Sequence, residues 1–175
     1  MIYNLQYELL LPTRFETYIK IGTKAYNQHY QHLWPNGDTT TYIKNSFTKE
    51  VLAKEAEDKN TELYLIKMNT QYVGLLKISL HKELQEYSKQ ESLFLDKIYI
   101  LNEFSGKGIG TKSLQFVENR AKELSKKVIF LESMQKGLAL SFYLANNYTI
   151  VDTTQVPFDN VIENEKPMYL LLKKI

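Results

Sequence analysis

The segment from Leu93 to Leu124 constrains the fold of this chain more than any other. A run of branched and aromatic residues, Leu93–Leu101, predicts a strand, and glycines at positions 106, 108 and 110 follow it. The next apolar residues step by three and four along the chain, which predicts one face of an α-helix: Leu114, Val117, Ala121 and Leu124. A strand that leads through a glycine turn straight into a helix indicates a mixed α/β fold.

The same patterns place the remaining elements. Short runs rich in branched and aromatic residues predict further strands at Ile2–Leu10, Glu62–Met68, Tyr72–Leu80, Val128–Met134, Tyr148–Thr153 and Met168–Leu172. Helices are predicted from the cap Thr13 to the turn at Pro35, from the cap Thr48 to Asp58, and over Ala139–Asn147, with Asp38 as a further cap. We expect His81–Gln90 to be a polar loop without a core. No linker or repeat divides residues 1–175, so we expect a single domain.

Composition excludes several classes of protein. With 43% hydrophobic and 24% charged residues, the chain is an ordinary globular protein, and its net charge of +2 is too small for non-specific nucleic-acid binding. It has no cysteine, which excludes disulfides and thiolate metal sites and fits a reducing, cytoplasmic environment. No stretch is long and apolar enough to span a membrane. His29 and His32 have helical spacing, but no third ligand completes a metal site, so we predict no metal.

The glycine turn predicts an anion site. Alternate glycines allow positive φ angles and close approach of the backbone to a ligand, and the free N–H groups at a helix start attract phosphate. Lys107 and Lys112 add positive charge nearby. A Walker A loop is not supplied, because GxxxxGK[ST] is missing, and a Rossmann fingerprint lacks its third glycine. A turn that merely begins a helix is the alternative.

The turn Ser105-Gly106-Lys107-Gly108-Ile109-Gly110 resembles the acetyl-CoA pyrophosphate loop of the GCN5-related N-acetyltransferases, the GNAT superfamily. That loop has the pattern Q/R-x-x-G-x-G/A. Gly108 and Gly110 occupy its two small positions, whereas Ser105 replaces the usual Gln or Arg. The resemblance implies that Ser105–Thr111 binds the pyrophosphate mainly through backbone N–H groups, with Lys107 compensating for the lost side chain.

Two further stretches resemble the same superfamily in the right order. Leu95-Asp96-Lys97-Ile98-Tyr99-Ile100 is similar to its fourth strand, and Ala139–Tyr148 is similar to its A-x-x-F-Y-x-x-x-G-F signature. In that signature Ala139, Phe142 and Tyr143 match directly, and Asn147 replaces a glycine. Lys136 stands where the family often has Asn.

The resemblance implies a GNAT-like α/β (α+β) domain with a mixed, mostly antiparallel sheet whose fourth and fifth strands splay apart. Acetyl-CoA would lie in the gap and bond the backbone of Ile98, Tyr99 and Ile100, with Phe142 and Lys136 also near the cofactor. An acetyl group would pass to a primary amine by direct attack in a ternary complex.

The resemblance also assigns catalytic roles. Tyr143 matches the tyrosine general acid of the family, and a phenol is protonated at neutral pH; simple packing beside Phe142 is its alternative. Asp96 is a candidate general base, with Glu132 or a chain of waters as alternatives, and it could instead be a solvated or ion-paired carboxylate.

Softer similarities narrow the acceptor. Ser46–Leu52 and Pro157-Phe158 resemble the PaiA-type polyamine N-acetyltransferases, so a small polyamine is the first expected acceptor. An acidic pocket for it could draw on loop carboxylates at Glu83, Glu86, Asp152, Asp159 and Glu163. The alternatives are a non-catalytic acyl-CoA-binding or regulatory protein and an enzyme acting on a protein amine. The family resemblance also allows a homodimer.

Overall fold

The structure, a computed structural model, describes residues 3–175. Its strands are β1 (Leu5–Leu9), β2 (Thr61–Met68), β3 (Gln71–Ser79), β4 (Ser92–Ile100), β5 (Val128–Met134), β6 (Thr149–Gln155) and β7 (Pro167–Lys174). Its α-helices are α1 (Phe15–Tyr30), α2 (Thr40–Ser46), α3 (Lys49–Glu57), α4 (Ile109–Glu123) and α5 (Leu138–Ala145). Each predicted strand and helix is confirmed, apart from Ile2 of the first predicted strand, which lies outside the described residues.

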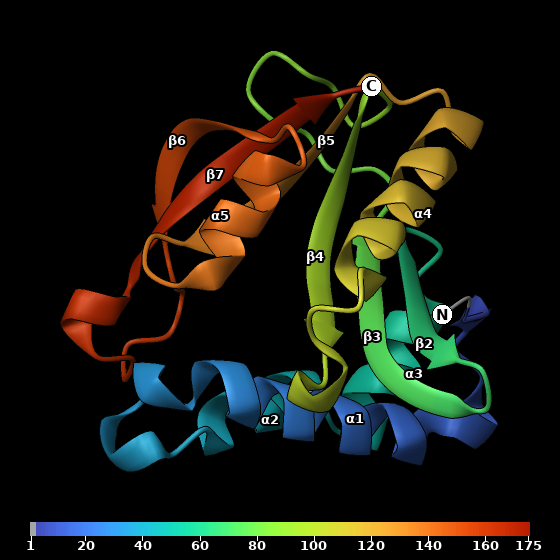
Figure 1. Cartoon of the computed structure of the whole chain (residues 1–175). Coiled ribbons are helices and arrows are strands. Elements are labelled where there is room, and N and C mark those ends of the chain that lie inside the picture. Colours follow the sequence, from blue (N-terminus) through green and yellow to red (C-terminus); the bar gives the residue numbers. More distant parts are fainter. Residues whose placement is uncertain (1–2) are drawn as a thin grey trace.

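The seven strands form one sheet in the order β1-β2-β3-β4-β5-β7-β6, and only the β4–β5 pair is parallel. That pair is short, since Ser92–Phe94 meets Val128–Phe130 and no pairing continues beyond it. Figure 1 shows β4 and β5 diverging from their shared end. The predicted mixed, mostly antiparallel sheet with splayed fourth and fifth strands is therefore confirmed.

Helices cover both faces of the sheet. On one face α4 and α5 bury Leu114, Val117 and Tyr143 against the strands. On the other face α1 and α3 bury Tyr18 and Leu52. Figure 1 shows α4 and α5 on opposite sides of the place where β4 and β5 separate.

A β-bulge interrupts β4 where the splay begins. Lys77 of β3 pairs with Lys97, whereas the next residue, Ile78, pairs with Leu95. Asp96 is thus the extra residue of β4, with no partner on β3. A bulge re-aims side chains and breaks the ladder locally, which makes this point suitable for a site.

One local prediction is confirmed in detail and two differ. Thr48 caps α3 as predicted, accepting a hydrogen bond from the Val51 N–H at 3.2 Å. Thr13 is not a cap, because Pro12 begins a 3₁₀ turn (η1, Pro12–Arg14) before α1. The loop of residues 81–90 has a buried anchor after all, since Leu84 packs with Phe94 and Phe130.

Within residues 3–175, no helix is long and apolar enough to cross a membrane.

Candidate active site

The glycine turn presents bare backbone at the start of α4. Gly106 and Gly108 have φ angles of +73° and +74°, and a Cβ built on either would meet nothing within 4 Å. Gly108 caps α4 without a side-chain hydrogen bond. Among residues 3–175 the first three N–H groups of the helix, at 109–111, have no protein acceptor. Free donors beside open space at the positive end of a helix dipole suit the pyrophosphate of a coenzyme A thioester.

Two residues of the turn, Ile109 and Gly110, pack against the rest of the protein. A Cβ on Gly110 would lie 2.9 Å from Cζ of Phe142, so Gly110 is small because the ring packs there. The side chain of Ile109 is buried with Ile66 and Val73, leaving only its N–H for a ligand. The Phe142 ring therefore packs against the glycine turn at Gly110 and helps to fix its position. The sequence motif alone did not reveal this role.

The polar side chains around the turn are exposed. Ser105, Lys107 and Thr111 all face solvent, and Nζ of Lys107 lies 5.0 Å from the ring centre of Phe104. Lys136, between β5 and α5, instead donates to the Asn164 carbonyl at 2.9 Å and pairs with Glu165 at 3.1 Å. In this structure Lys136 thus ties the β5–α5 turn to the 3₁₀ turn η5 (Glu163–Glu165).

A pocket opens where β4 and β5 part. Its walls come from α1, α2, both splayed strands, α5 and the β6–β7 segment. They are Tyr26, Tyr30, Leu33, Tyr42, Phe94, Asp96, Ile98, Tyr99, Glu132, Ser133, Met134, Ala139, Tyr143, Val156, Phe158 and Met168. The pocket brings together Tyr143 and Asp96, two predicted site residues that lie far apart in the sequence.

Tyr143 projects from α5 into this pocket. Its side chain is largely buried, between Phe142 and Tyr148. Burial, with smaller contributions from Tyr30 and Tyr148, raises the pKa of the Tyr143 phenol well above its ordinary value. Its hydroxyl makes no hydrogen bond to another of residues 3–175. Tyr143 is therefore a protonated donor that remains available to a ligand.

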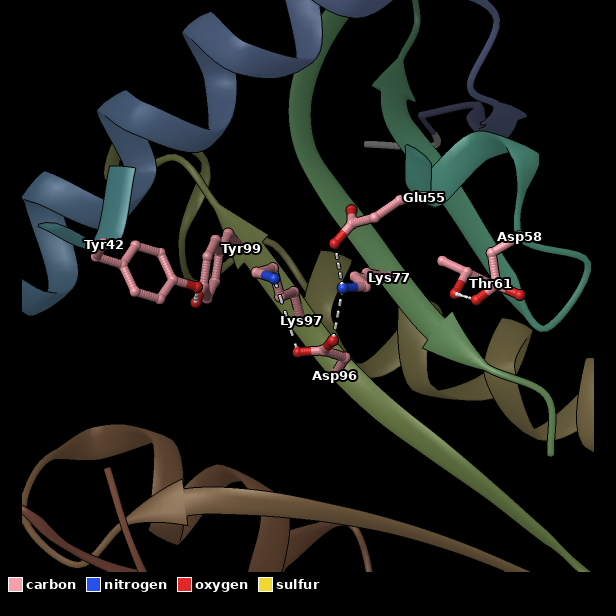
Figure 2. Close-up of polar contacts among 8 residues, drawn as sticks. All are labelled: Tyr42, Glu55, Asp58, Thr61, Lys77, Asp96, Lys97 and Tyr99. Carbon is pink, nitrogen blue, oxygen red and sulfur yellow. Dashed lines mark hydrogen bonds and ion pairs between the residues drawn. The ribbon is translucent and has the colours of Figure 1, made fainter. Parts of the chain in front are cut away.

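Asp96 and Glu132 face the pocket from the two separating strands. The Asp96 carboxylate lies 3.0 Å from Nζ of Lys77 and 3.7 Å from Nζ of Lys97 (Figure 2). Burial opposes ionisation, but Lys97 and Lys77 together hold the pKa of Asp96 below its ordinary value. None of the five loop carboxylates expected to form an acidic pocket lines it. Asp159 and Glu163 do belong to the β6–β7 segment beside the pocket, but the residues that line the pocket do not include them.

Aromatic rings form the wall opposite α5. The rings of Tyr26 and Tyr42 stack at 3.6 Å, and Tyr30 and Tyr99 lie 5.7 Å apart. The hydroxyls of Tyr42 and Tyr99 share a hydrogen bond of 2.6 Å (Figure 2). Tyr99, predicted only as a backbone contact, therefore also builds this wall with its side chain. Sequence reasoning missed the wall, since its members come from α1, α2 and β4 with no common motif.

The β6–β7 segment closes one side of the pocket. Val156 and Phe158 line it, and the Phe158 ring packs 5.7 Å from Trp34. Val161 is buried in the same helical layer, and the Ile162 N–H bonds the Leu33 carbonyl at 2.9 Å. These contacts attach the segment to the N-terminal helices and close the pocket on that side.

Neither His29 nor His32 lines the pocket. Nε2 of His29 donates to the carbonyl of Ile100 at 2.7 Å, which fixes the end of β4 against α1. This is a packing role, as predicted for His29. In the part of the chain that the structure describes, no group of three or more His, Asp or Glu residues could hold a metal ion.

Comparison with known proteins now identifies the family. A profile of the acetyltransferase (GNAT) family matches residues 22–145, which is most of the chain and includes the glycine turn and Tyr143. The chain therefore belongs to the acetyltransferase (GNAT) family. The predicted family is confirmed.

Individual relatives agree with this assignment. The chain is 23% identical over 113 residues to an uncharacterised N-acetyltransferase in the pepI 3′ region of Lactobacillus delbrueckii subsp. lactis, covering 64% of this chain and 65% of the relative. The crystal structure of the PaiA N-acetyltransferase from Thermoplasma acidophilum in complex with coenzyme A superposes with a TM-score of 0.78 at 16% identity, covering 98% and 99% of the two chains. The ribosomal-protein-S18-alanine N-acetyltransferase from Escherichia coli gives 0.68 at 11% identity, covering 98% and 94%.

Proposed function

We propose that residues 1–175 form one N-acetyltransferase domain that moves an acetyl group from acetyl-CoA to a primary amine. One observation carries the proposal: the gap between β4 and β5 places a protonated tyrosine, Tyr143, in one pocket with two carboxylates. The free N–H groups of the glycine turn lie on the same side of the sheet as α5, because Gly110 packs against Phe142.

Backbone groups hold the cofactor in this proposal. The N–H groups at the start of α4 bind the pyrophosphate, with Lys107 nearby. The main chain of β4 at Ile98, Tyr99 and Ile100 runs along the open edge of the splay, free of pairing with β5. Such an edge can bond the amide groups of pantetheine as it would a neighbouring strand, and one N–H can face the thioester oxygen.

The chemistry is a direct displacement. The neutral amine attacks the acetyl carbonyl carbon, the C–N bond forms, and the C–S bond breaks. Tyr143 gives its proton to the departing thiolate, and the proton that the new amide nitrogen loses returns through water to the Tyr143 phenolate. The acceptor ammonium loses its proton to Glu132 or to water, because the lysine pairs make Asp96 a weak base. Asp96 instead binds the ammonium before it is deprotonated.

A small polyamine is the acceptor that we propose first. Two carboxylates on facing strands suit two ammonium groups, and tyrosine faces attract cations while they cover a polymethylene chain. The similarity to the PaiA N-acetyltransferase adds support from fold alone. The cover formed by Val156 and Phe158 favours a small acceptor over a protein amine, since an extended peptide would have to displace it.

A thiol-release assay over a panel of amines tests the proposal. The panel pairs putrescine with its matched monoamine, n-butylamine, and adds spermidine and a peptide with a free N-terminus. We expect turnover of the polyamines and weaker turnover of n-butylamine. A thermal shift with acetyl-CoA but no turnover on any amine would favour the non-catalytic acyl-CoA-binding protein. Preferred turnover of the peptide would make a protein amine the acceptor.

Two further expectations remain proposals. The family resemblance allows a homodimer, which light scattering coupled to size-exclusion chromatography measures directly. The absence of cysteine fits a cytoplasmic location. Cell fractionation of the native host tests that placement.

A further inference from the structure

A chain of four charged side chains lies beside the pocket, and only one of them, Asp96, has a role in the chemistry proposed above. Nζ of Lys77, on β3, lies 2.6 Å from Oε1 of Glu55 on α3 and 3.0 Å from Oδ2 of Asp96 on β4. Lys97 completes the chain at 3.7 Å from Oδ1 of Asp96. Figure 2 shows Lys77 between the two carboxylates, with Lys97 on the other side of Asp96.

The chain is largely shielded from water. The side chains of Lys77 and Lys97 are only 13% and 9% exposed, against 21% for Glu55 and 28% for Asp96. Partly buried ion pairs are screened less than surface pairs, so removing one partner here has a larger effect than on the surface. Asp96 is the only one of the four that lines the pocket.

The bulge explains why Asp96 needs outside support. As the extra residue of β4 it has no partner on β3, so the ladder does not fix its orientation. Lys77 pairs with Lys97 in the register, directly beside the bulge, and reaches across to the Asp96 carboxylate. Glu55, on α3, lies 2.6 Å from the same Lys77 ammonium and therefore shares this cation with Asp96.

We propose that Lys77 is a positioning residue, which holds the bulge residue Asp96 at the wall of the acceptor pocket as the anion that binds the ammonium of the acceptor. Glu55 competes with Asp96 for the ammonium of Lys77, and this competition weakens the ion pair between Lys77 and Asp96. The inference rests on the proposed function, because it takes the acceptor to be a cationic amine.

Other groups also act on Asp96 and must stay constant in any test. Lys97 and Lys82 favour its ionised form. Tyr18 of α1, whose buried hydroxyl has no partner among residues 3–175, and Tyr42 of α2 lie close enough for Asp96 to raise their pKa values. Glu132 faces it from β5.

The test compares three variants with opposite expectations. In Lys77→Met, Asp96 loses its nearest cation, and we expect KM for the amine to rise at least about tenfold with KM for acetyl-CoA unchanged. In Glu55→Gln, Asp96 becomes the only carboxylate that pairs with Lys77, and KM for the amine should stay level or fall. Lys77→Arg should restore most of the affinity. Lys173→Met is the matched control, because Lys173 forms an equally buried pair with Glu118 at 2.6 Å, with side chains 19% and 18% exposed.

A merely structural ion chain would behave differently. It would lower the melting temperature in Lys77→Met and Glu55→Gln alike and move the amine KM of both variants in the same direction or not at all. Either pattern would overturn the proposal. The pH profile of kcat/KM for the amine is a second readout. Its acidic limb should move to higher pH in Lys77→Met, because the pKa of Asp96 rises when its cation is removed.

A measurement without turnover keeps this inference separate from the proposed function. Carbon-13 NMR of labelled aspartate follows the titration of Asp96 in the wild type and in Lys77→Met. We expect the midpoint to rise in the variant and fall in Glu55→Gln. An unchanged midpoint would overturn the positioning role even in an active enzyme. A wild type that acetylates no amine, with the midpoints moving as expected, would instead contradict the proposed function alone.

Discussion

In the function proposed above, the two ends of the β4–β5 splay recognise their ligands by different means. At the glycine turn the binding groups are backbone N–H groups, and the space around Gly106 and Gly108 is empty of side chains. At the acceptor end the wall consists of tyrosine rings and two carboxylates, Asp96 and Glu132, from five different elements. Binding at the glycine turn depends on the lack of side chains, which leaves the backbone N–H groups accessible. Binding at the acceptor end depends on the aromatic and carboxylate side chains themselves.

The difference has an energetic consequence. Backbone donors at a helix start are fixed by α4 itself, so changes of nearby side chains should alter affinity little. The acceptor wall depends on contacts between separate elements, such as the Tyr42–Tyr99 hydrogen bond. Single substitutions in the acceptor wall should therefore each change the affinity for the amine by a small amount. The predictions below test this contrast.

The largest effect should come from Gly108→Val. A valine side chain would enter the open space over the turn, and a β-branched residue is strained at a φ angle of +74°. We expect binding of acetyl-CoA, measured by isothermal titration calorimetry, to be abolished while circular dichroism shows a folded protein.

The control for Gly108→Val separates strain from lost contacts. Gly37→Val carries the same kind of strain, because its φ angle is +68°, in a turn that belongs to the N-terminal helices. It should lose stability but keep its affinity for acetyl-CoA. Wild-type affinity in Gly108→Val would remove the glycine turn from the cofactor site.

Tyr143→Phe should have the next largest effect, on the rate alone. The phenol acts on the thiolate only as it leaves, so its loss should lower kcat and leave KM for acetyl-CoA nearly unchanged. We expect a loss of about 10²-fold, at the lower end for acid catalysis, because water partly replaces the phenol. Burial raises the pKa of Tyr143, so the wild type should not lose this proton donor as pH rises to about 9.

Steady-state kinetics distinguish the two roles of Tyr143. A rise in KM for acetyl-CoA with kcat intact would make its ring a wall of the cofactor site. Wild-type kcat would mean that solvent or another group protonates the thiolate. Leu140→Ala on the same helix is a packing control, since Leu140 packs against the core without lining the pocket.

The contrast also explains what the sequence could predict. Backbone recognition needs glycines at fixed spacing next to a strand and a helix, so the turn Gly106–Gly110 was visible in a single short segment. The splay of the strands was implied only by the resemblance to the GNAT superfamily. The tyrosine wall arises only when α1, α2 and β4 meet in space, and 13 tyrosines gave no reason to choose among them. The ion pairs of Asp96 were equally hidden, because they depend on the β3–β4 register and on α3.

A smaller effect should distinguish Gly110, which packs against Phe142, from Gly106, which faces open space. In Gly110→Ala the new Cβ would press on Phe142, and overpacking of this kind costs about 1–3 kcal/mol, partly offset by better helix propensity. We expect a lower melting temperature with acetyl-CoA affinity within about threefold of wild type. Gly106→Ala should lose affinity for acetyl-CoA at a site where a Cβ meets no atom, and it should also lose some stability because the φ angle of +73° strains a residue with a side chain. Equal losses of affinity in both variants would contradict the division of roles.

The smallest effect should come from Tyr42→Phe, at the acceptor end. The substitution keeps the stack on Tyr26 but removes the hydrogen bond to Tyr99, which is worth about 1 kcal/mol. We expect a slightly lower free energy of unfolding, a rise of a few fold in KM for the amine, and unchanged binding of acetyl-CoA. Tyr30→Phe is the control, because the Tyr30 hydroxyl makes no hydrogen bond to another of residues 3–175. Burial raises the pKa of Tyr42, so the difference between Tyr42→Phe and the wild type should not change with pH across the neutral range. A loss of acetyl-CoA binding in Tyr42→Phe would show that the two ends of the splay are coupled, and that the acceptor wall also shapes the cofactor site.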